Sequence, residues 1–311
     1  MNGVGMAGAS NVTMAQLRYF VEAAENLSMT RAAENLRVAQ SAVSSSMAQL
    51  ERAIGVQLFI RKPAKGLILT AAGERFNHEA RGLLATLDEA LESVRGQVNE
   101  VSGTVTLACF VTLMPFFVPG LLAHLGALYP KLRVEVIETD SEGLVRALQS
   151  GRAHLGLGYA FGMAPMIRTT EVGVSRPYVL ISEGQRLAQS SSVSLDRVRN
   201  EPMILLDLPL SRDYFLDMFR LTGAAPEVRF RSSSYETVRS LVAQGQGFSI
   251  LNQLPTSAVT YSGESVVALA IRDEVPSLPI VLATLNGVKP TARSRALSDG
   301  VRSVIRSRYP Q

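Results

Sequence analysis

The sequence predicts an α/β protein whose N-terminal domain is all-α and whose long central helix leads into a region of alternating strands and helices. Helix caps and apolar spacing between Thr13 and Gly55 indicate the helical domain. A single apolar stripe runs from residue 71 to residue 99, and short apolar strands follow from residue 104. With 311 residues, 47% hydrophobic and 19% charged, the chain is expected to be globular and to form more than one domain.

Three helices are expected at the N-terminus. The first is predicted over Met14–Asn26, with Thr13 as its cap and Gln16 as the reciprocal partner. Ser28 can cap a short second helix, and Gly55 ends a third helix that begins after a tight turn at 37–39. Apolar residues at helical spacing form the predicted buried stripe of the third helix: Val43, Met47, Leu50 and Ile54.

The other face of the third helix is short and mostly uncharged, with Gln40, Ser41, Ser44, Ser45 and Gln49. Hydroxyls and amides of this size can reach phosphates and base edges in the major groove of duplex DNA. On the second helix, the candidate DNA contacts are Thr30 and Arg31. The alternative is an ordinary helical bundle, whose solvated face would more often carry Glu and Lys.

A basic hairpin is predicted directly after the third helix. Residues 61–66 lie between two apolar runs, at 58–60 and 67–69, and Pro63 and Gly66 supply the turn. As the wing of a winged helix-turn-helix, Arg61 and Lys65 would contact phosphates or the minor groove; the alternative is a solvated surface hairpin. Residues 1–70 hold seven basic and four acidic side chains, so one copy is expected to bind DNA weakly and two or more to act together.

The run LRYFVEAAENLSMTRAAENLRVAQSAVSSSMAQLERAIGVQLFIR, followed by LILTAAGE, resembles the N-terminal domain of the LysR-type transcriptional regulators. The resemblance covers residues 17–74 nearly without gaps, and its specific parts are the pair Ala32-Ala33, the run 40–44, the step Leu50-Glu51, and the hairpin with Gly73. One departure is the pair Ser45-Ser46, since family members often carry a basic residue just after Val43-Ser44. This departure removes a phosphate or guanine contact and so bears on the operator sequence.

A long helix is predicted from Ala71 to about Asn99, with Thr70 as its cap. Its single narrow stripe has a spacing near the heptad period, which favours pairing with a second copy over packing on its own domain. The resemblance likewise implies dimerisation through this helix. The stripe consists of Phe76, Ala80, Leu83, Leu87, Leu91, Val94 and Val98.

The rest of the chain alternates between short apolar strands and helical stretches, which predicts an α/β region with mainly parallel sheets. Strands are expected at 104–108, 132–138, 155–159, 178–181, 203–206, 228–231, 248–251 and 280–285. Helices are expected at 116–129, 142–150, 213–221, 235–243 and 292–308.

The resemblance implies that this region is an effector domain similar to periplasmic solute-binding proteins, with two α/β lobes joined by two crossing strands. Lobe one would be about 104–176 and 272–311, and lobe two about 177–271, with crossings near 174–177 and 268–272. The expected domains are then a disordered leader (1–12), a winged helix-turn-helix (13–70), a linker and dimerisation helix (71–100) and the effector-binding domain (101–311).

A small ligand is expected in the cleft between the lobes, because ligands of open α/β sheets bind at strand ends and helix starts. Free N–H groups at helix starts also attract anions. Each candidate could instead be an ordinary cap or turn residue. The amides of Asn252 and Gln253, which end a strand, could bind a ligand or merely cap the strand. The effector-binding candidates are Thr112, Ser141, Ser211, Ser233, Ser234, Tyr235 and Asn252.

Two single residues carry alternatives of their own. Cys109 ends the first strand of lobe one near the cleft, so a redox sensor is conceivable, but the chain offers no second cysteine and a buried core thiol is the default. His154 stands where the family usually has Asp; it could sense pH, but a histidine in a surface turn is the more common case.

Several classes are disfavoured. The sequence has no run of about 18 apolar residues, so no membrane helix is expected. The first residues do not resemble a secretory signal, and a single cysteine fits a reducing compartment. A cytoplasmic protein is therefore expected. No catalytic or nucleotide-binding motif and no metal spacing appears, so we expect neither an enzyme nor a cofactor. A solute-binding receptor-like module without a regulatory role would explain residues 104–311 alone.

The resemblance also implies a mechanism and partners. A homodimer, or a homotetramer formed by two dimers, would hold its winged helix-turn-helix domains on an interrupted palindrome of double-stranded DNA. A small-molecule effector would change the closure of the lobes, and with it DNA bending and the access of RNA polymerase.

Overall fold

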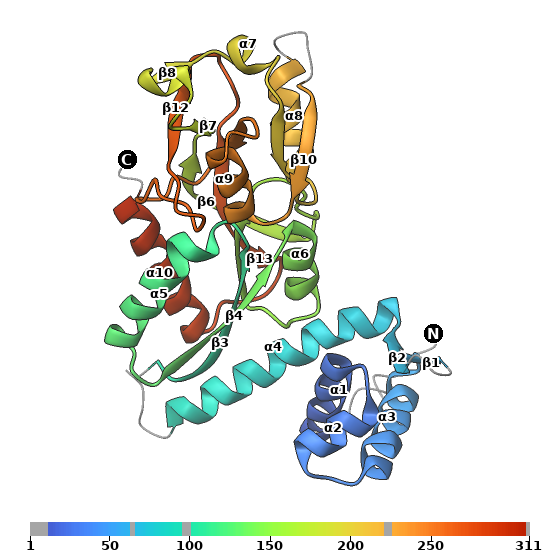
Figure 1. Cartoon of the computed structure of the whole chain (residues 1–311). Coiled ribbons are helices and arrows are strands. Elements are labelled where there is room, and N and C mark those ends of the chain that lie inside the picture. Colours follow the sequence, from blue (N-terminus) through green and yellow to red (C-terminus); the bar gives the residue numbers. More distant parts are fainter. Residues whose placement is uncertain (1–11, 63–65, 95–100, 221–225, 309–311) are drawn as a thin grey trace, which may run out of the picture.

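The protein is described by a computed structural model over residues 12–62, 66–94, 101–220 and 226–308. These residues form a small N-terminal helical domain, the long helix α4 (Ala71–Val94) and two α/β lobes (Figure 1). Helix α4 lies between the helical domain and lobe one, which is the lobe that contains β3 (Gly103–Phe110). Within these ranges no helix combines the length and the apolar character that crossing a bilayer requires.

The helical domain consists of α1 (Met14–Asn26), α2 (Met29–Leu36) and α3 (Gln40–Ile54), at the predicted bounds. The capping box forms as predicted: the hydroxyl of Thr13 accepts from the backbone of Gln16, and the Gln16 side chain accepts from the backbone of Thr13. Gly55 ends α3 with a φ of 77°, a conformation that glycine adopts without strain. Phe20 is fully buried at the centre of this domain.

A hairpin of β1 (Phe59–Lys62) and β2 (Gly66–Leu69) joins α3 to α4 (Ala71–Val94). The Thr70 hydroxyl accepts from the backbone of Gly73 at 2.9 Å and caps α4 as predicted. A Cβ at Gly73 would lie 2.1 Å from the carbonyl oxygen of Leu58, so glycine lets the hairpin pack directly against the helix. The predicted continuation of α4 beyond residue 94, the leader residues 1–11, and the wing tip with Lys65 lie outside the described residues.

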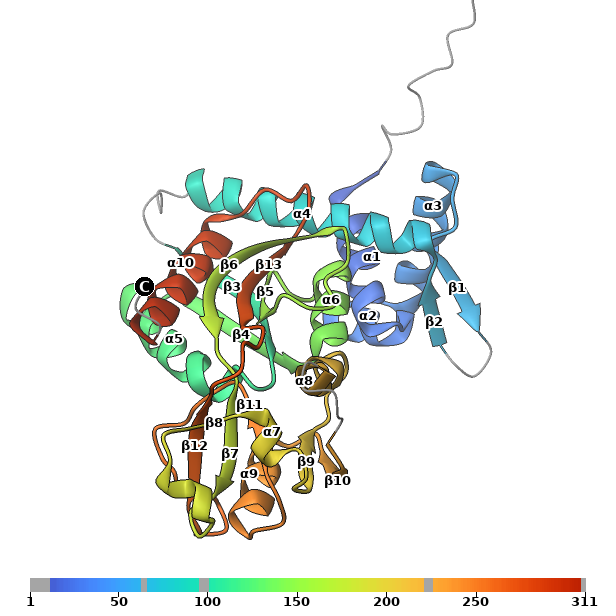
Figure 2. The same cartoon turned by 90° about the horizontal axis from the view of Figure 1, so that it is seen from above.

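Lobe one is a five-stranded sheet in the order β4-β3-β5-β13-β6. Helices α5 (Met114–Leu128) and α10 (Ala292–Arg308) pack together on one face, and α6 (Ser141–Gln149) covers the other (Figures 1 and 2). The strands are β3 (Gly103–Phe110), β4 (Leu132–Thr139), β5 (Leu155–Tyr159), β6 (Ile167–Ser175) and β13 (Leu278–Leu285).

Lobe two contains a four-stranded sheet in the order β11-β7-β12-β8 and a separate parallel pair, β9 and β10. Its strands are β7 (Tyr178–Ser182), β8 (Ser192–Val193), β9 (Met203–Leu206), β10 (Val228–Ser232), β11 (Ser249–Leu251) and β12 (Val266–Ile271). Its helices are the 3₁₀ helix η2 (Arg186–Gln189), α7 (Leu195–Val198), α8 (Ser211–Arg220) and α9 (Tyr235–Ala243).

The prediction of mainly parallel sheets is wrong. Strand β13 is antiparallel to β5 and β6, and β7 is antiparallel to β11 and β12. The reason is that β6 and β7 carry the chain out of lobe one while β12 and β13 carry it back, so the crossing strands run in opposite directions (Figure 2). Strand β8 was not predicted, and β6 and β12 were expected only as the crossing strands near 174–177 and 268–272.

Candidate DNA-binding surface and interlobe ligand site

The predicted DNA contacts on α3 lie on one outer face of the helical domain. Gln40, Ser41, Ser45 and Gln49 are exposed and Ser44 is half-buried, whereas the opposite stripe of Val43, Met47 and Leu50 is buried in the core. Thr30 and Arg31 are exposed in the first turn of α2. Helix α3 lies on the side of its domain that faces away from the lobes (Figures 1 and 2), so a groove could receive it without displacing another element.

The hairpin is fixed to the end of α3 by a carboxylate. Glu51 accepts hydrogen bonds from the backbone N–H groups of Leu58 and Phe59 at 2.7 and 3.0 Å. The backbone of Arg61 pairs with Leu67 in this hairpin, and the Arg61 side chain, like Lys65, lies outside the described part. Glu51 therefore holds the position of the wing, a role that the sequence pattern alone did not assign.

Four of the seven effector candidates come together between the lobes. Thr112, Ser211, Tyr235 and Asn252 line one small cavity of about 20 Å³, which is room for roughly one water molecule. The cleft is thus nearly filled by its own side chains. The remaining lining residues are Phe110, Tyr159, Phe161, Leu206, Leu208, Phe215, Gln253 and Leu278.

The structure does not place the other three candidates in this lining. Ser234 is an ordinary helix cap, because its hydroxyl accepts from the backbone of Thr237 at 3.2 Å, and Ser233 beside it is exposed. Ser141 is buried at the start of α6, and its hydroxyl has no hydrogen-bond partner.

Aromatic rings form the lobe-one wall of the cavity. The ring of Phe110 meets Tyr159 at 5.2 Å and Phe161 at 6.0 Å, both edge-on. Tyr159 and Phe161 stack with their centroids 5.6 Å apart and their planes 28° apart. This wall offers a flat apolar surface to a ligand.

Gln253 joins the two lobes at the back of the cavity. Its amide nitrogen donates to the Tyr159 hydroxyl at 3.1 Å and to the Ser175 hydroxyl at 3.0 Å, both in lobe one. Its backbone carbonyl accepts from the hydroxyls of Tyr178 (2.6 Å) and Tyr235. Burial raises the pKa of Tyr178 well above its usual value and that of Tyr235 to about 12, so both phenols keep their protons as donors. Gln253 was expected either to bind a ligand or to cap a strand; here it bridges the lobes.

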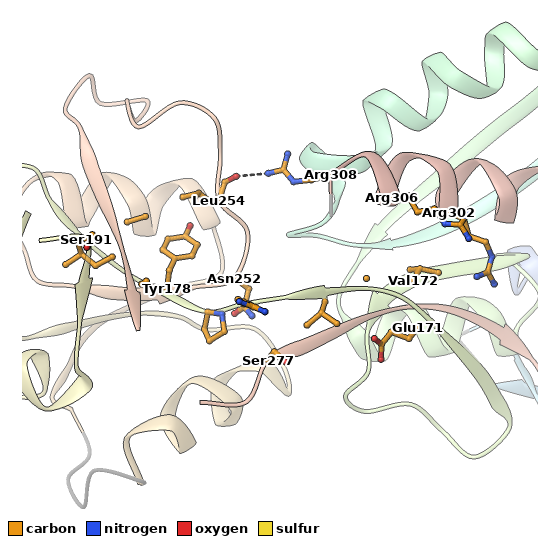
Figure 3. A pocket seen from close by; sticks show the side chains of 17 residues that line it. Glu171, Val172, Tyr178, Ser191, Asn252, Leu254, Ser277, Arg302, Arg306 and Arg308 are labelled. Carbon is orange, nitrogen blue, oxygen red and sulfur yellow. Dashed lines mark hydrogen bonds between the residues drawn. The ribbon is translucent and has the colours of Figure 1, made fainter. Parts of the chain in front are cut away.

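A second, open groove lies along the crossing strands β6 and β12 and has a different character. It has a volume of about 1160 Å³, and Figure 3 shows Glu171, Arg302 and Arg306 on its lobe-one side. Arg308 donates to the carbonyl of Leu254 in lobe two at 2.6 Å, so the end of α10 braces one lobe against the other (Figure 3). Of the predicted effector residues, Asn252 alone lines this groove.

Cys109 and His154 both lie away from the cavity lining. Cys109 is fully buried on β3, and burial, followed by the charge of Glu138, raises the pKa of its thiol, so the thiol stays protonated. The His154 ring accepts from the backbone N–H of Thr106 at 3.0 Å. Desolvation by the surrounding protein, and then Arg293 and Arg81, lower the pKa of His154.

Helix α4 is tied to lobe one at the end of α6. The amide of Asn77 donates to the carbonyl of Ser150 at 2.7 Å, and Arg81 donates to the carbonyl of Gly151 at 3.1 Å. Arg81 also forms an ion pair of 3.2 Å with Glu25 of α1. This junction of three elements was not predicted, because its partners are more than fifty residues apart in the sequence. Among the described residues, no group of histidine, cysteine and acidic side chains is arranged to hold a metal ion.

Comparisons with known proteins agree with both halves of the chain. The pattern described as "Bacterial regulatory helix-turn-helix protein, lysR family" matches residues 14–74, and the one described as "LysR substrate binding domain" matches residues 99–306. The HTH-type transcriptional regulator CfxR of Cupriavidus necator is 31% identical over 246 residues, which are 78% of this chain and 76% of that protein. A hydrogen peroxide-inducible genes activator of Dickeya chrysanthemi is 26% identical, covering 94% of this chain and 95% of that protein.

Solved structures show the same architecture. HinK, a LysR family transcriptional regulator from Pseudomonas aeruginosa, is similar with a TM-score of 0.64 at 35% identity, over 95% of this chain and 99% of that one. A full-length OxyR variant from Pseudomonas aeruginosa has a TM-score of 0.78 at 23% identity, over 95% of both chains, a likeness that concerns the fold alone.

Proposed function

The chain belongs to the LysR family of transcriptional regulators, and from this premise we propose how it binds DNA and how it is regulated. The reader is the winged helix-turn-helix of residues 13–70, the helix of residues 71–100 pairs two chains, and residues 101–311 bind the effector. A homodimer places its two α3 helices on the half-sites of an interrupted palindrome, and a small molecule between the lobes changes that binding.

One observation carries the DNA-binding part of the proposal: α3 presents an exposed, nearly uncharged face of glutamine and serine side chains. The contacts proposed there are Gln40, Ser41, Ser44, Ser45 and Gln49, with Thr30 and Arg31 from α2 and Arg61 and Lys65 from the wing. Hydrogen-bonding groups on α3 would read bases, and the arginines and the lysine would contact phosphates.

The stripe on α4 supports pairing of two chains. Leu83 is 55% exposed and Leu91 is 44% exposed in a single chain, so the helix leaves the later part of its apolar stripe uncovered. Burying such a stripe against the same stripe of a second copy is the usual solution for a long amphipathic helix. Assembly of two dimers into a tetramer, contact with RNA polymerase and a cytoplasmic location belong to this proposal as well.

The effector part rests on the interlobe cavity, with Thr112, Ser211, Tyr235 and Asn252 as the proposed contacts. The Dickeya relative is named for hydrogen peroxide-inducible genes, and peroxide sensing through a thiol is not proposed for this chain. Cys109 is its single cysteine, and its buried thiol is held in the unreactive protonated form. Family members are transcriptional regulators rather than enzymes, and we extend this to the present chain.

DNA selection tests the proposed function. The full chain is mixed with sheared genomic DNA, bound fragments are sequenced, and the best fragment is used in gel shifts against scrambled duplex. Gln49→Ala should weaken binding to the selected fragment by about 1–3 kcal/mol and leave binding to scrambled duplex nearly unchanged. Gln189→Ala, which truncates an exposed glutamine of lobe two, is the matched control. Equal losses on both duplexes would contradict base reading by α3.

A further inference from the structure

We propose that the interlobe cavity takes an uncharged ligand with a flat, largely apolar body and a hydrogen-bond donor, rather than a carboxylate or another anion. This inference rests on the proposed function, because it assumes that the cavity is the effector site. Four features of the cavity carry it: the composition of its walls, the compensation of its helix starts, the orphaned acceptor of Asn252 and the packing of Phe161.

The first feature is the absence of charge from the walls. The lining residues include aromatic rings, leucines, two hydroxyl residues and two amides, and none of those described is acidic, basic or a histidine. An ionised carboxylate that enters such a site loses its hydration and gains no opposite charge. An uncharged ring gains the apolar contact and does not lose this hydration energy.

The second feature is that three helix starts around the cleft, those of α6, α8 and α9, already have acidic partners. The start of α5, which follows Thr112, has none. Asp140 caps α6 by accepting from the backbone of Gly143 at 2.7 Å. Asp213 stands in the first turn of α8, and Glu236 stands in the first turn of α9. A carboxylate in this position compensates the positive end of the helix dipole, so an anionic ligand would meet a compensated dipole and like charge.

Arginines beside the cleft are also engaged. Asp207, which follows β9, pairs with Arg212 at 2.6 Å and with Arg231 at 3.4 Å. Arg239 of α9 pairs with Glu236 at 2.6 Å. Each of these three arginines is therefore already paired with a carboxylate of the chain itself, with Asp207 shared between Arg212 and Arg231.

The third feature is an acceptor without a donor. The Tyr214 hydroxyl donates its proton to the carbonyl of Pro276 at 2.9 Å, so its oxygen can only accept from Asn252. The side-chain nitrogen of Asn252 must therefore face Tyr214, which leaves its buried side-chain oxygen without a partner. An amide, phenol or indole N–H or O–H can satisfy this oxygen, whereas an ionised carboxylate has no proton to donate.

The fourth feature is that the ring of Phe161 occupies space that a ligand's ring could take. Phe161 is half-buried on the loop after β5 and stacks on Tyr159. Because the cavity holds about one water molecule, a ring-sized ligand must displace a side chain, and Phe161 is the one on a loop open to solvent. At the next residue, a Cβ on Gly162 would lie 2.1 Å from Leu210 of lobe two, so the lobes touch at this loop. Moving Phe161 aside would therefore act on the loop at which the lobes touch.

The test compares ligands that differ in charge and little in shape. Benzamide is titrated against benzoate, and indole against indole-2-carboxylate, into the full chain near neutral pH, with calorimetry and thermal shift as readouts. The uncharged member of each pair should bind at least about tenfold more tightly, a difference of about 1.4 kcal/mol. Equal or tighter binding of the carboxylates would overturn the proposal, and so would the failure of both uncharged compounds to bind up to their solubility limits.

Two variants locate the site. Phe161→Arg places a cation on the aromatic wall and should invert the preference, so that benzoate binds more tightly than benzamide. Phe230→Arg makes the same change at an exposed phenylalanine of β10 outside the lining and should leave the preference as in the wild type. Inversion in neither variant, or in both, would contradict binding in this cavity.

The selected DNA fragment is offered to the same samples. A chain that prefers uncharged ligands but shows no preference for any DNA refutes the proposed function and leaves the ligand class established. A chain that selects DNA but prefers the carboxylates refutes the ligand class alone.

Discussion

Gln253 shows how a single side chain can hold two lobes together. Its amide and its backbone carbonyl make hydrogen bonds to Tyr159, Ser175, Tyr178 and Tyr235 within a buried region. Buried polar groups of this kind contribute little net stability when satisfied but cost free energy when a partner is removed. Gln253 therefore stabilises the contact between the two lobes rather than the hydrophobic core of either lobe.

Replacing Gln253 should weaken the folded effector domain. Gln253→Met keeps the approximate volume but removes the two hydrogen bonds that the amide donates to the hydroxyls of Tyr159 and Ser175, so we expect a loss of about 1–3 kcal/mol in the free energy of unfolding. Urea denaturation of the full chain measures it. The control is Gln246→Met, at an exposed position. Equal stability of the Gln253 and Gln246 variants would contradict a bridging role.

His154 gives the stability of the chain a pH dependence. Its pKa is lowered in the folded state, so the folded chain binds this proton more weakly than the unfolded chain does. The free energy of unfolding should therefore be highest above about pH 6.5, the usual histidine value, and fall as the pH drops from there toward the folded-state pKa.

His154→Asn should flatten this part of the curve, measured by denaturation at a series of pH values between about 7.5 and 5. Some slope is expected to remain, because burial lowers the pKa of His78 as well. A variant whose curve has the full slope of the wild type would show that His154 does not contribute.

What the sequence could predict at the residue scale depended on distance along the chain. Thr13, Ser28 and Thr70 were identified as caps because each partner lies three residues away. The side-chain partners of Gln253 lie 94 and 78 residues away, so no local pattern could reveal them. For Ser234 the sequence left open an effector contact or an ordinary cap, and in the structure its hydroxyl caps α9.

Among the secondary-structure elements, α4 has an apolar stripe that one chain covers only in part. Phe76 and Ala80 pack into the helical domain, whereas Leu83 and Leu91 further along the stripe are exposed. The first part of the stripe thus packs against the helical domain, and the later part is available to pack against a second chain.

Leu83→Glu should weaken the dimer. A carboxylate on the stripe would be buried against its copy, a change that we expect to cost about 2 kcal/mol or more of association free energy. Sedimentation of the full chain at several concentrations measures the change. Val288→Glu adds the same charge at a position exposed to a similar extent and should sediment as the wild type does. An unchanged dimer in Leu83→Glu would place the interface elsewhere.

Elements with local signals were predicted well, and those that depend on pairing were not. The bounds of α1, α3, α9, α10, β5 and β9 agree with the sequence prediction. Strand β6 was missed because its sequence, IRTTEVGVS, is largely polar and exposed, and it becomes a strand by pairing with β13 from Ile167↔Leu285 to Ser175↔Leu278. The segment becomes a strand because it hydrogen-bonds to a strand more than a hundred residues away, which its own sequence pattern does not indicate.

At the scale of the whole molecule, α6 spans the distance between the lobe interface and the reader. It begins at Ser141 beside the loop of Gly162 and ends next to Ser150 and Gly151, which hold Asn77 and Arg81 of α4. Since Arg81 also pairs with Glu25 of α1, one junction connects an effector lobe, the linker helix and the reader.

Arg81→Met should reduce communication between the two sites. We expect ligand affinity to stay within about twofold of the wild type, while the ligand-induced change in DNA affinity shrinks by about 1 kcal/mol or more. Gel shifts with and without the ligand measure the coupling. Arg220→Met, at an exposed arginine of lobe two, is the control. Undiminished coupling in Arg81→Met would exclude this junction as the connection.

Two copies of this chain should read duplex DNA through the exposed face of α3. The measurement is selection from genomic fragments at about 150 mM salt, with the wild type and the Gln49→Ala variant side by side. The wild type should enrich one sequence built from two inverted half-sites, and the variant should lose this enrichment. Fragments enriched no more than random duplex, or enriched equally by both proteins, would contradict DNA reading through α3.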